Sequence, residues 1–91
     1  MKELLPIGSV LTLKGGTKKC MIVGRLQNQT GKNIVYDYAA VLYPEGIIDS
    51  DHFYLFNQED IDILYYVGMQ DVEEFNYRFE LEDQMKKLGV A

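Results

Sequence analysis

The sequence predicts a small α+β domain: a strongly bent antiparallel β-sheet, or an SH3-like barrel, of about five strands with one C-terminal α-helix. Three observations support this prediction. Apolar and β-branched segments between residues 8 and 68 are separated by glycine, proline and asparagine turns. The connections are too short for the crossovers that parallel strands need. Residues 71–88 carry helix start and stop signals. At 91 residues, we expect one domain spanning residues 1–91.

The first two strands are predicted on either side of a paired-glycine turn. Residues 9–14 are apolar and β-branched, and Gly15-Gly16 accepts the positive φ angles that tight hairpin turns demand. The strand expected at residues 19–27 contains the apolar run Cys20-Met21-Ile22-Val23, which is typical of a central strand covered on both faces. Gly24 interrupts that strand and indicates a bulge or a sharp bend.

The remaining strands are predicted between a polar turn at 28–33 and residue 68. Residues 34–43 alternate between two faces and end in a turn at Tyr43-Pro44-Glu45-Gly46. One of the apolar pieces at 47–48 and 53–56 is expected to be a short strand. Asn57 is expected to cap one helical turn at 58–61, and a last strand follows as far as Gly68.

Residues 71–88 are predicted to form the α-helix. Asp71 and Glu74 have the spacing of a capping box, which satisfies free backbone amides at a helix start. Lys86 and Lys87 fall in the last turn, where the helix dipole favours positive charge, and Gly89 is the expected stop.

The apolar residues of this helix form two stripes. At about 100° per residue, Val72, Phe75 and Phe79 gather on one face, and a second group gathers roughly opposite. The second group is Tyr77, Leu81, Met85 and Leu88. Because a lone helix on a small sheet buries one face, either the other stripe meets a second protein or the helix bends near Tyr77 to turn both stripes inward.

We predict a partner-binding site on the second stripe. Four exposed apolar side chains, each worth about 1.5–3 kcal/mol on full burial, would form a stripe that a partner can use. The expected apolar contacts are Tyr77, Leu81, Met85 and Leu88, and the expected acidic rim is Glu80, Glu82 and Asp83.

Charge is distributed unevenly along the chain. Residues 1–32 carry six basic side chains and one acidic one, a net of +5. Residues 33–91 carry three basic and thirteen acidic ones, a net of −10, which gives the overall −5. The asymmetry is either a solvated exterior without a role or a pair of surfaces of opposite sign. We expect no nucleic-acid partner, because the acidic remainder would repel phosphate.

The sequence gives little support for a catalytic site, a metal site or a cofactor site. His52 has no nucleophile context, and the group Asp49, Asp51 and His52 lacks the spacing of a helix-loop calcium site. Cys20 lies among apolar neighbours, where a thiol packs as a small hydrophobe. We therefore expect no enzyme, no metal and no cofactor.

The location is expected to be cytoplasmic. The single cysteine, Cys20, cannot form an internal disulfide, which fits a reducing compartment. No apolar run approaches the roughly 20 residues that a membrane helix needs, and residues 1–9 lack the apolar core of a signal peptide.

Several segments together carry a family resemblance. They are Leu5-Pro6-Ile7-Gly8-Ser9-Val10, Leu13-Lys14-Gly15-Gly16-Thr17-Lys18-Lys19, Met21-Ile22-Val23-Gly24-Arg25, Tyr36-Asp37-Tyr38, Tyr43-Pro44-Glu45-Gly46 and Leu55-Phe56-Asn57-Gln58-Glu59-Asp60-Ile61. Over about residues 5–68, the chain resembles a small domain-of-unknown-function family of Gram-positive bacteria that is found beside type VII secretion genes and LXG toxins. The resemblance implies a cytoplasmic chaperone or targeting factor that binds an LXG toxin and presents it to the secretion machinery.

Two alternative functions stay open. An immunity protein would neutralise the toxin by covering its active site, and the acidic run Glu59-Asp60-Ile61-Asp62 is a candidate contact for a basic toxin cleft. A structural subunit would instead use the helix stripe to form a homodimer. An enzyme is the least favoured class.

Overall fold

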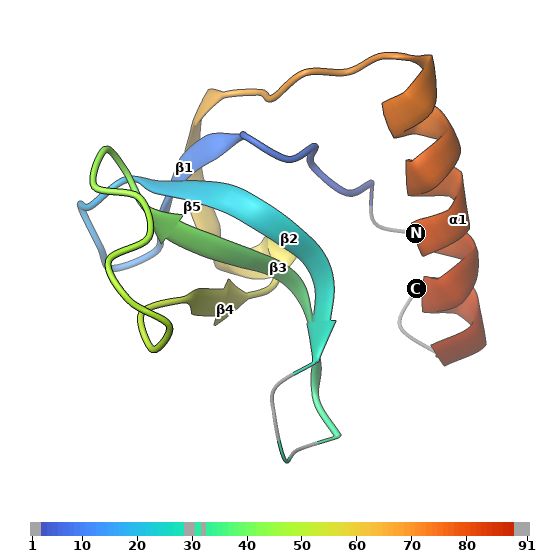
Figure 1. The fold of residues 1–91 in the computed structure, drawn as a ribbon, viewed down its shortest axis with the longest axis horizontal. Helices are drawn as coiled ribbons and strands as arrows, with labels where there is room; N and C mark the ends of the chain where they lie inside the picture. Colours follow the sequence, from blue (N-terminus) through green and yellow to red (C-terminus); the bar gives the residue numbers. More distant parts are fainter. Residues whose placement is uncertain (1–2, 29–30, 32, 89–91) are drawn as a thin grey trace.

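The computed structural model describes residues 3–28, 31 and 33–88, which form one five-stranded sheet and one α-helix (Figure 1). The elements are β1 (Val10–Leu13), β2 (Cys20–Asn28), β3 (Val35–Leu42), β4 (Tyr54–Phe56), the 3-10 turn η1 (Gln58–Asp60), β5 (Ile61–Tyr66) and α1 (Val72–Leu88). Neighbouring strands pair antiparallel in the order β4-β3-β2-β1-β5. The predicted α+β class is confirmed, and the sheet is open and bent rather than closed into a barrel.

The strands begin and end close to where the local sequence signals placed them. β2 lies in the middle of the sheet, as its apolar run predicted. The register against β3 shifts between Ile22 and Gly24, which is the irregularity that the glycine indicated. At the start of η1, the Asp60 carboxylate accepts a hydrogen bond from the Asn57 amide at 2.9 Å. The predicted turn at 28–33 lies partly, and the helix stop at Gly89 wholly, outside the described residues.

The hydrophobic core lies between the inner face of the sheet and α1. Cross-strand partners such as Leu11 with Cys20, and Ile22 with Ala40, share this face. The buried cluster consists of Leu4, Leu11, Cys20, Ile22, Tyr38, Ala40, Phe56, Leu81 and Met85. Burial raises the pKa of the Cys20 thiol, and the nearby Lys18 opposes that rise more weakly. Cys20 therefore packs as a small apolar side chain.

Polar side chains join the N-terminal segment and η1 to β3. The Tyr38 hydroxyl accepts a hydrogen bond from the Leu5 amide at 2.9 Å and donates one to the side-chain oxygen of Gln58. The Asp37 carboxylate accepts a hydrogen bond from the Gln58 amide at 2.8 Å. These bonds hold Leu4 and Leu5 over the core, where the N-terminal segment contacts the helix.

The segment that leads from β5 to α1 runs beside the N-terminal segment (Figure 1), and the two are joined at Gly68 and Ser9. The Ser9 hydroxyl donates to the Pro6 carbonyl oxygen at 2.8 Å and accepts from the Gly68 amide at 3.0 Å. A Cβ atom on Gly68 would lie 2.0 Å from the carbonyl oxygen of Ile7. Only glycine fits this close approach of the two segments.

Gly68→Ala should lower the free energy of unfolding by about 2 kcal/mol or more, because the new methyl group overlaps backbone atoms that cannot move aside. Urea denaturation followed by circular dichroism measures the change. The matched control is Gly16→Ala, whose Cβ would meet its nearest neighbour at 3.6 Å, and it should change stability by no more than about 0.5 kcal/mol. Equal effects of the two substitutions would show that the backbones at Gly68 and Ile7 are not closely packed.

Candidate partner-binding surface

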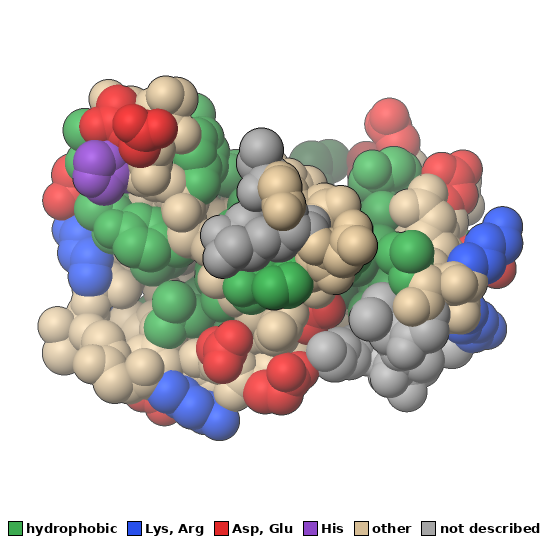
Figure 2. All heavy atoms as spheres, turned by 90° about the horizontal axis from the view of Figure 1, so that it is seen from below, with side chains coloured by type: hydrophobic (Ala, Val, Ile, Leu, Met, Phe, Trp, Pro, Cys, Tyr) green, Lys and Arg blue, Asp and Glu red, His purple; other side chains and the backbone are tan. Residues whose placement is uncertain are grey.

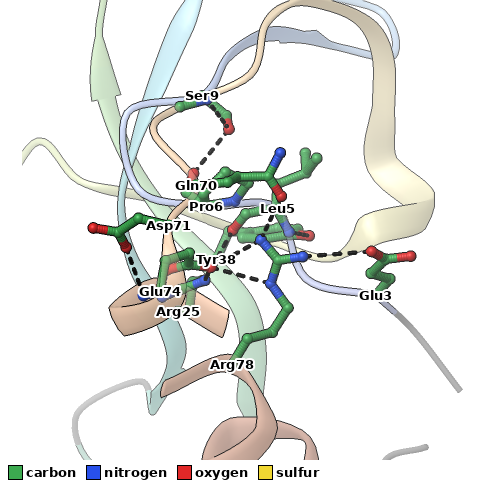
Figure 3. A network of polar contacts seen from close by, with 11 residues as sticks. Glu3, Leu5, Pro6, Ser9, Arg25, Tyr38, Gln70, Asp71, Glu74 and Arg78 are labelled. Atoms are coloured by element: carbon green, nitrogen blue, oxygen red, sulfur yellow. Dashed lines mark hydrogen bonds and ion pairs between the residues drawn. The ribbon is translucent and has the colours of Figure 1, made fainter. Parts of the chain in front are cut away.

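A buried ion-pair cluster of Arg25, Glu74 and Arg78 joins β2 to α1 (Figure 3). The Arg25 guanidinium donates two hydrogen bonds to Glu74, from Nη1 to Oε2 at 2.6 Å and from Nη2 to Oε1 at 2.8 Å. Arg78, one turn further along the helix, donates to the same Oε2 from Nε at 3.1 Å and from Nη2 at 2.9 Å. We call this group the Arg-Glu-Arg cluster.

The two arginines of the cluster also contact the segments that lie around the start of the helix. Arg25 Nη1 lies 3.4 Å from the Leu5 carbonyl oxygen, and Arg78 Nη2 donates to the Gln70 side-chain oxygen at 2.9 Å. Arg78 Nη1 lies 3.4 Å from an exposed carboxylate oxygen of Glu3. Four stretches of chain therefore meet at two guanidinium groups.

Glu74 is ionised at neutral pH in this environment. Burial raises the pKa of its carboxyl group, but the hydrogen bonds and charges of Arg25 and Arg78 outweigh that effect and hold the pKa below its ordinary value. The charged hydrogen bonds on both carboxylate oxygens offset the cost of removing the group from water.

The cluster determines which face of α1 turns inward. Glu74, Arg78, Leu81 and Met85 follow at spacings of four, three and four residues, so they lie on one face of the helix. Leu81 is 4% exposed and Met85 is 0% exposed. The Asp71 carboxylate accepts a hydrogen bond from the Glu74 amide at 2.9 Å, as the capping spacing predicted. The Glu74 carboxylate, however, bonds to the two arginines.

The expectation that the second stripe faces a partner is wrong for its two central residues. Leu81 and Met85 belong to the core, because they lie on the same helix face as Glu74 and Arg78, and this face turns toward the sheet. Tyr77 and Leu88 remain exposed. The Arg25 guanidinium lies 5.5 Å from the centre of the Tyr77 ring, in the geometry of a cation–π contact. The structure does not join these four residues into one surface.

The predicted acidic rim does lie outside the core. Glu80 and Asp83 are exposed, and Glu82 is half-buried. Asp83 pairs with Lys87 at 3.2 Å on the helix surface. These carboxylates flank the helix face that lies opposite the Arg-Glu-Arg cluster. Phe79 is on that face, and Asp83 is its neighbour because it follows by four residues.

The exposed apolar face of α1 consists of Val72, Phe75 and Phe79, which we call the outer stripe. These side chains are 75%, 43% and 66% exposed. The Phe75 ring lies 5.2 Å from the Arg78 guanidinium, in the geometry of a cation–π contact. The apolar pattern of the sequence indicates this stripe. It does not indicate that the stripe faces outward, because the inward position of α1 depends on Glu74 and Arg78, which are polar. Figure 2 shows that apolar side chains reach the surface over both the sheet and the helix.

The turn that carries the lone histidine is a surface feature. His52 Nδ1 lies 2.6 Å from a carboxylate oxygen of Asp49, and both side chains are exposed. The hydrogen bond with His52 holds the pKa of Asp49 below its ordinary value. Among the described residues, no group of three or more histidine, cysteine, aspartate or glutamate side chains is placed to hold a metal ion. No helix in the described part of the chain is long and apolar enough to cross a bilayer.

Comparison with known proteins gives one result. A family model described as "Domain of unknown function (DUF4176)" matches residues 4–77. The matched region includes Arg25 and Glu74 and stops before Arg78, so it covers the sheet and the first turns of α1. No curated protein and no solved structure matches the chain.

Glu74→Gln should lower the free energy of unfolding by about 3 kcal/mol, because it leaves the buried Arg25 guanidinium without a counter-charge and leaves Arg78 with only the exposed Glu3 carboxylate. Chemical denaturation at pH 7 measures the loss. The control is Glu73→Gln, an exposed acid in the same helical turn, which should cost no more than about 0.5 kcal/mol. A loss below about 1 kcal/mol in the Glu74 variant would contradict the role given to the cluster.

The same carboxylate predicts a pH dependence. Folding lowers the pKa of Glu74, so its charged form contributes to the free energy of unfolding. This contribution is fully present above the ordinary glutamate pKa of about 4.3 and is lost as the pH falls through the lowered pKa. Unfolding free energies measured from about pH 6 to about pH 3 should therefore fall more steeply for the native chain than for Glu74→Gln. Parallel curves of unfolding free energy against pH for the two proteins would contradict the lowered pKa of Glu74.

Proposed function

Because the chain belongs to the DUF4176 family of domains of unknown function, we propose a function argued from the surface that the fold leaves exposed. The protein is a non-catalytic adaptor that binds another protein through the outer stripe of α1. Its partner presents an apolar groove into which Val72, Phe75 and Phe79 insert. In the finer form of the proposal, the adaptor is a cytoplasmic chaperone or targeting factor for export of an LXG toxin by type VII secretion.

One observation carries the proposal: a helix held by buried charges turns three large apolar side chains to solvent. The three follow at i, i+3 and i+7, which is the spacing with which an amphipathic helix presents anchors to a hydrophobic groove. Each would contribute about 1.5–3 kcal/mol on full burial. The outward face of a surface helix typically carries charged or polar side chains instead.

The charges beside the outer stripe favour a basic rim on the partner. Glu80, Glu82 and Asp83 border the apolar residues, and residues 33–91 carry a net charge of −10. The negative electrostatic potential of these groups increases the rate at which a positively charged partner associates, and it affects the dissociation rate less.

The finer proposal is supported by the resemblance of residues 5–68 to the family found beside type VII secretion genes and LXG toxins. The outer stripe supplies the physical part of that role, since a targeting factor must hold its cargo without acting on it chemically. The secretion machinery is the second partner in this proposal.

The double variant Val72→Asp with Phe79→Asp should bind a co-expressed LXG toxin from the same genome at least tenfold more weakly, because two apolar anchors are lost. Co-purification followed by calorimetric titration measures the change. Both positions are exposed, so the free energy of unfolding should stay within about 1 kcal/mol of the native value.

The matched control is Glu80→Gln with Glu82→Gln, which keeps the apolar residues and should reduce mainly the association rate and its salt dependence. Undiminished toxin binding by the Val72 and Phe79 variant would overturn the proposed surface. Protection of a cell that produces the toxin internally, without any effect on export, would identify an immunity protein instead.

A further inference from the structure

A groove of about 450 Å³ lies on the outer face of the sheet, opposite the face that packs on α1. It is lined by Gly8, Val10, Lys19, Met21, Tyr43, Tyr65 and Tyr66. We call it the tyrosine groove. Its size and apolar, aromatic lining are those of a site that takes one large side chain with a few polar contacts.

Strand pairing builds the floor of this groove. Val10 pairs with Met21 on β2 and with Tyr66 on β5, so these three side chains share one face across three strands. At the far side, the Tyr43 amide donates to the Lys19 carbonyl oxygen at 2.9 Å. That bond holds the Tyr43 and Lys19 backbones side by side on the groove wall.

A β-bulge places the second tyrosine of the wall. Val10 pairs with Tyr66 whereas Leu11 pairs with Leu64, so Tyr65 is an extra residue on β5. In a regular strand, consecutive side chains point to opposite faces. Because of the bulge, Tyr65 and Tyr66 both line the groove. A bulge that aims two aromatic rings at one hollow is a specific arrangement, of the kind found beside binding sites.

The groove carries a positive charge. Lys19 is the one charged side chain among the described residues that line it, and its Nζ lies 4.9 Å from the centre of the Tyr65 ring. The nearby Glu45 carboxylate pairs with Lys18 at 2.7 Å. An occupant with its own positive charge would be repelled by Lys19, whereas a carboxylate would be attracted.

We propose that the tyrosine groove docks a partner's peptide segment in which an aromatic or large aliphatic residue is followed by an acidic one. The apolar side chain enters between Tyr43 and Tyr66, and the carboxylate pairs with Lys19. This inference rests on the proposed function only in taking the partner to be a protein. It assigns a second contact, formed by residues other than those of the outer stripe.

The position of β5 favours a peptide over a free small molecule. β5 is the last strand of the sheet, so no strand among the described residues pairs with the backbone groups on its outer side. A peptide that lies in the groove offers main-chain hydrogen-bond donors and acceptors to that edge, which a free aryl carboxylate does not. Main-chain pairing would then supply affinity, and the groove with Lys19 would supply selectivity.

The test uses the isolated full chain and capped tetrapeptides of sequence AFEA, AFQA, AFKA and AAEA, titrated in amide-resolved NMR experiments. AFEA should shift the signals of residues around the groove and bind about two- to fivefold more tightly than AFQA, the range expected for one solvent-exposed ion pair. AFKA and AAEA should bind more weakly than AFQA. Lys19→Gln should abolish the preference for AFEA over AFQA, whereas the matched surface variant Lys14→Gln should keep it.

Three results would overturn the inference: equal binding of all four peptides, a preference for AFKA, or binding of free phenylacetate as tight as that of AFEA. The last result would make the groove a site for small aryl carboxylates. The Val72→Asp, Phe79→Asp variant should keep its affinity for AFEA, because the outer stripe takes no part. Failure of this inference and failure of the proposed function are therefore separate outcomes.

Discussion

The rotation of α1 about its own axis depends on the carboxylate of Glu74, whose side chain is 11% exposed. Arg25 reaches it from β2 and Arg78 from the next turn of the helix, so both of its oxygens accept charged hydrogen bonds. Any rotation that carries the carboxylate away from β2 would leave the buried Arg25 guanidinium without its counter-charge, which costs several kcal/mol. In the position that satisfies the charges, Leu81 and Met85 complete the core.

A buried ion pair often adds little net stability, because removing charges from water costs nearly as much as their attraction returns. Its clearest contribution is to exclude alternative arrangements, and α1 has such an alternative. Turned by about half a rotation, the helix would offer Val72, Phe75 and Phe79 to the sheet. The Arg-Glu-Arg cluster selects against that arrangement, and the apolar residues on the other face stay exposed for a partner.

The sequence was sufficient to predict the five strands, the irregularity at Gly24 and the extent of α1, because each depends on local propensity and on turn residues. The inward face of α1 was not predictable from its apolar pattern. Half of that face is polar, and Glu74 and Arg78 read as ordinary surface residues until Arg25, which is 49 positions away from Glu74, is brought beside them. The tyrosine groove was missed because the bulge at Tyr65 has no glycine to mark it.

The orientation of α1 can be measured by the rate at which a thiol reagent labels single cysteine substitutions under native conditions. Phe79→Cys should react almost as fast as an unfolded peptide, and Leu81→Cys should react far more slowly, with the buried native Cys20 as an internal reference. Denaturation curves confirm that both variants are folded during labelling. Fast labelling at Leu81 with protection at Phe79 would show that the opposite face of the helix packs on the sheet, and the account given for the Arg-Glu-Arg cluster would be contradicted.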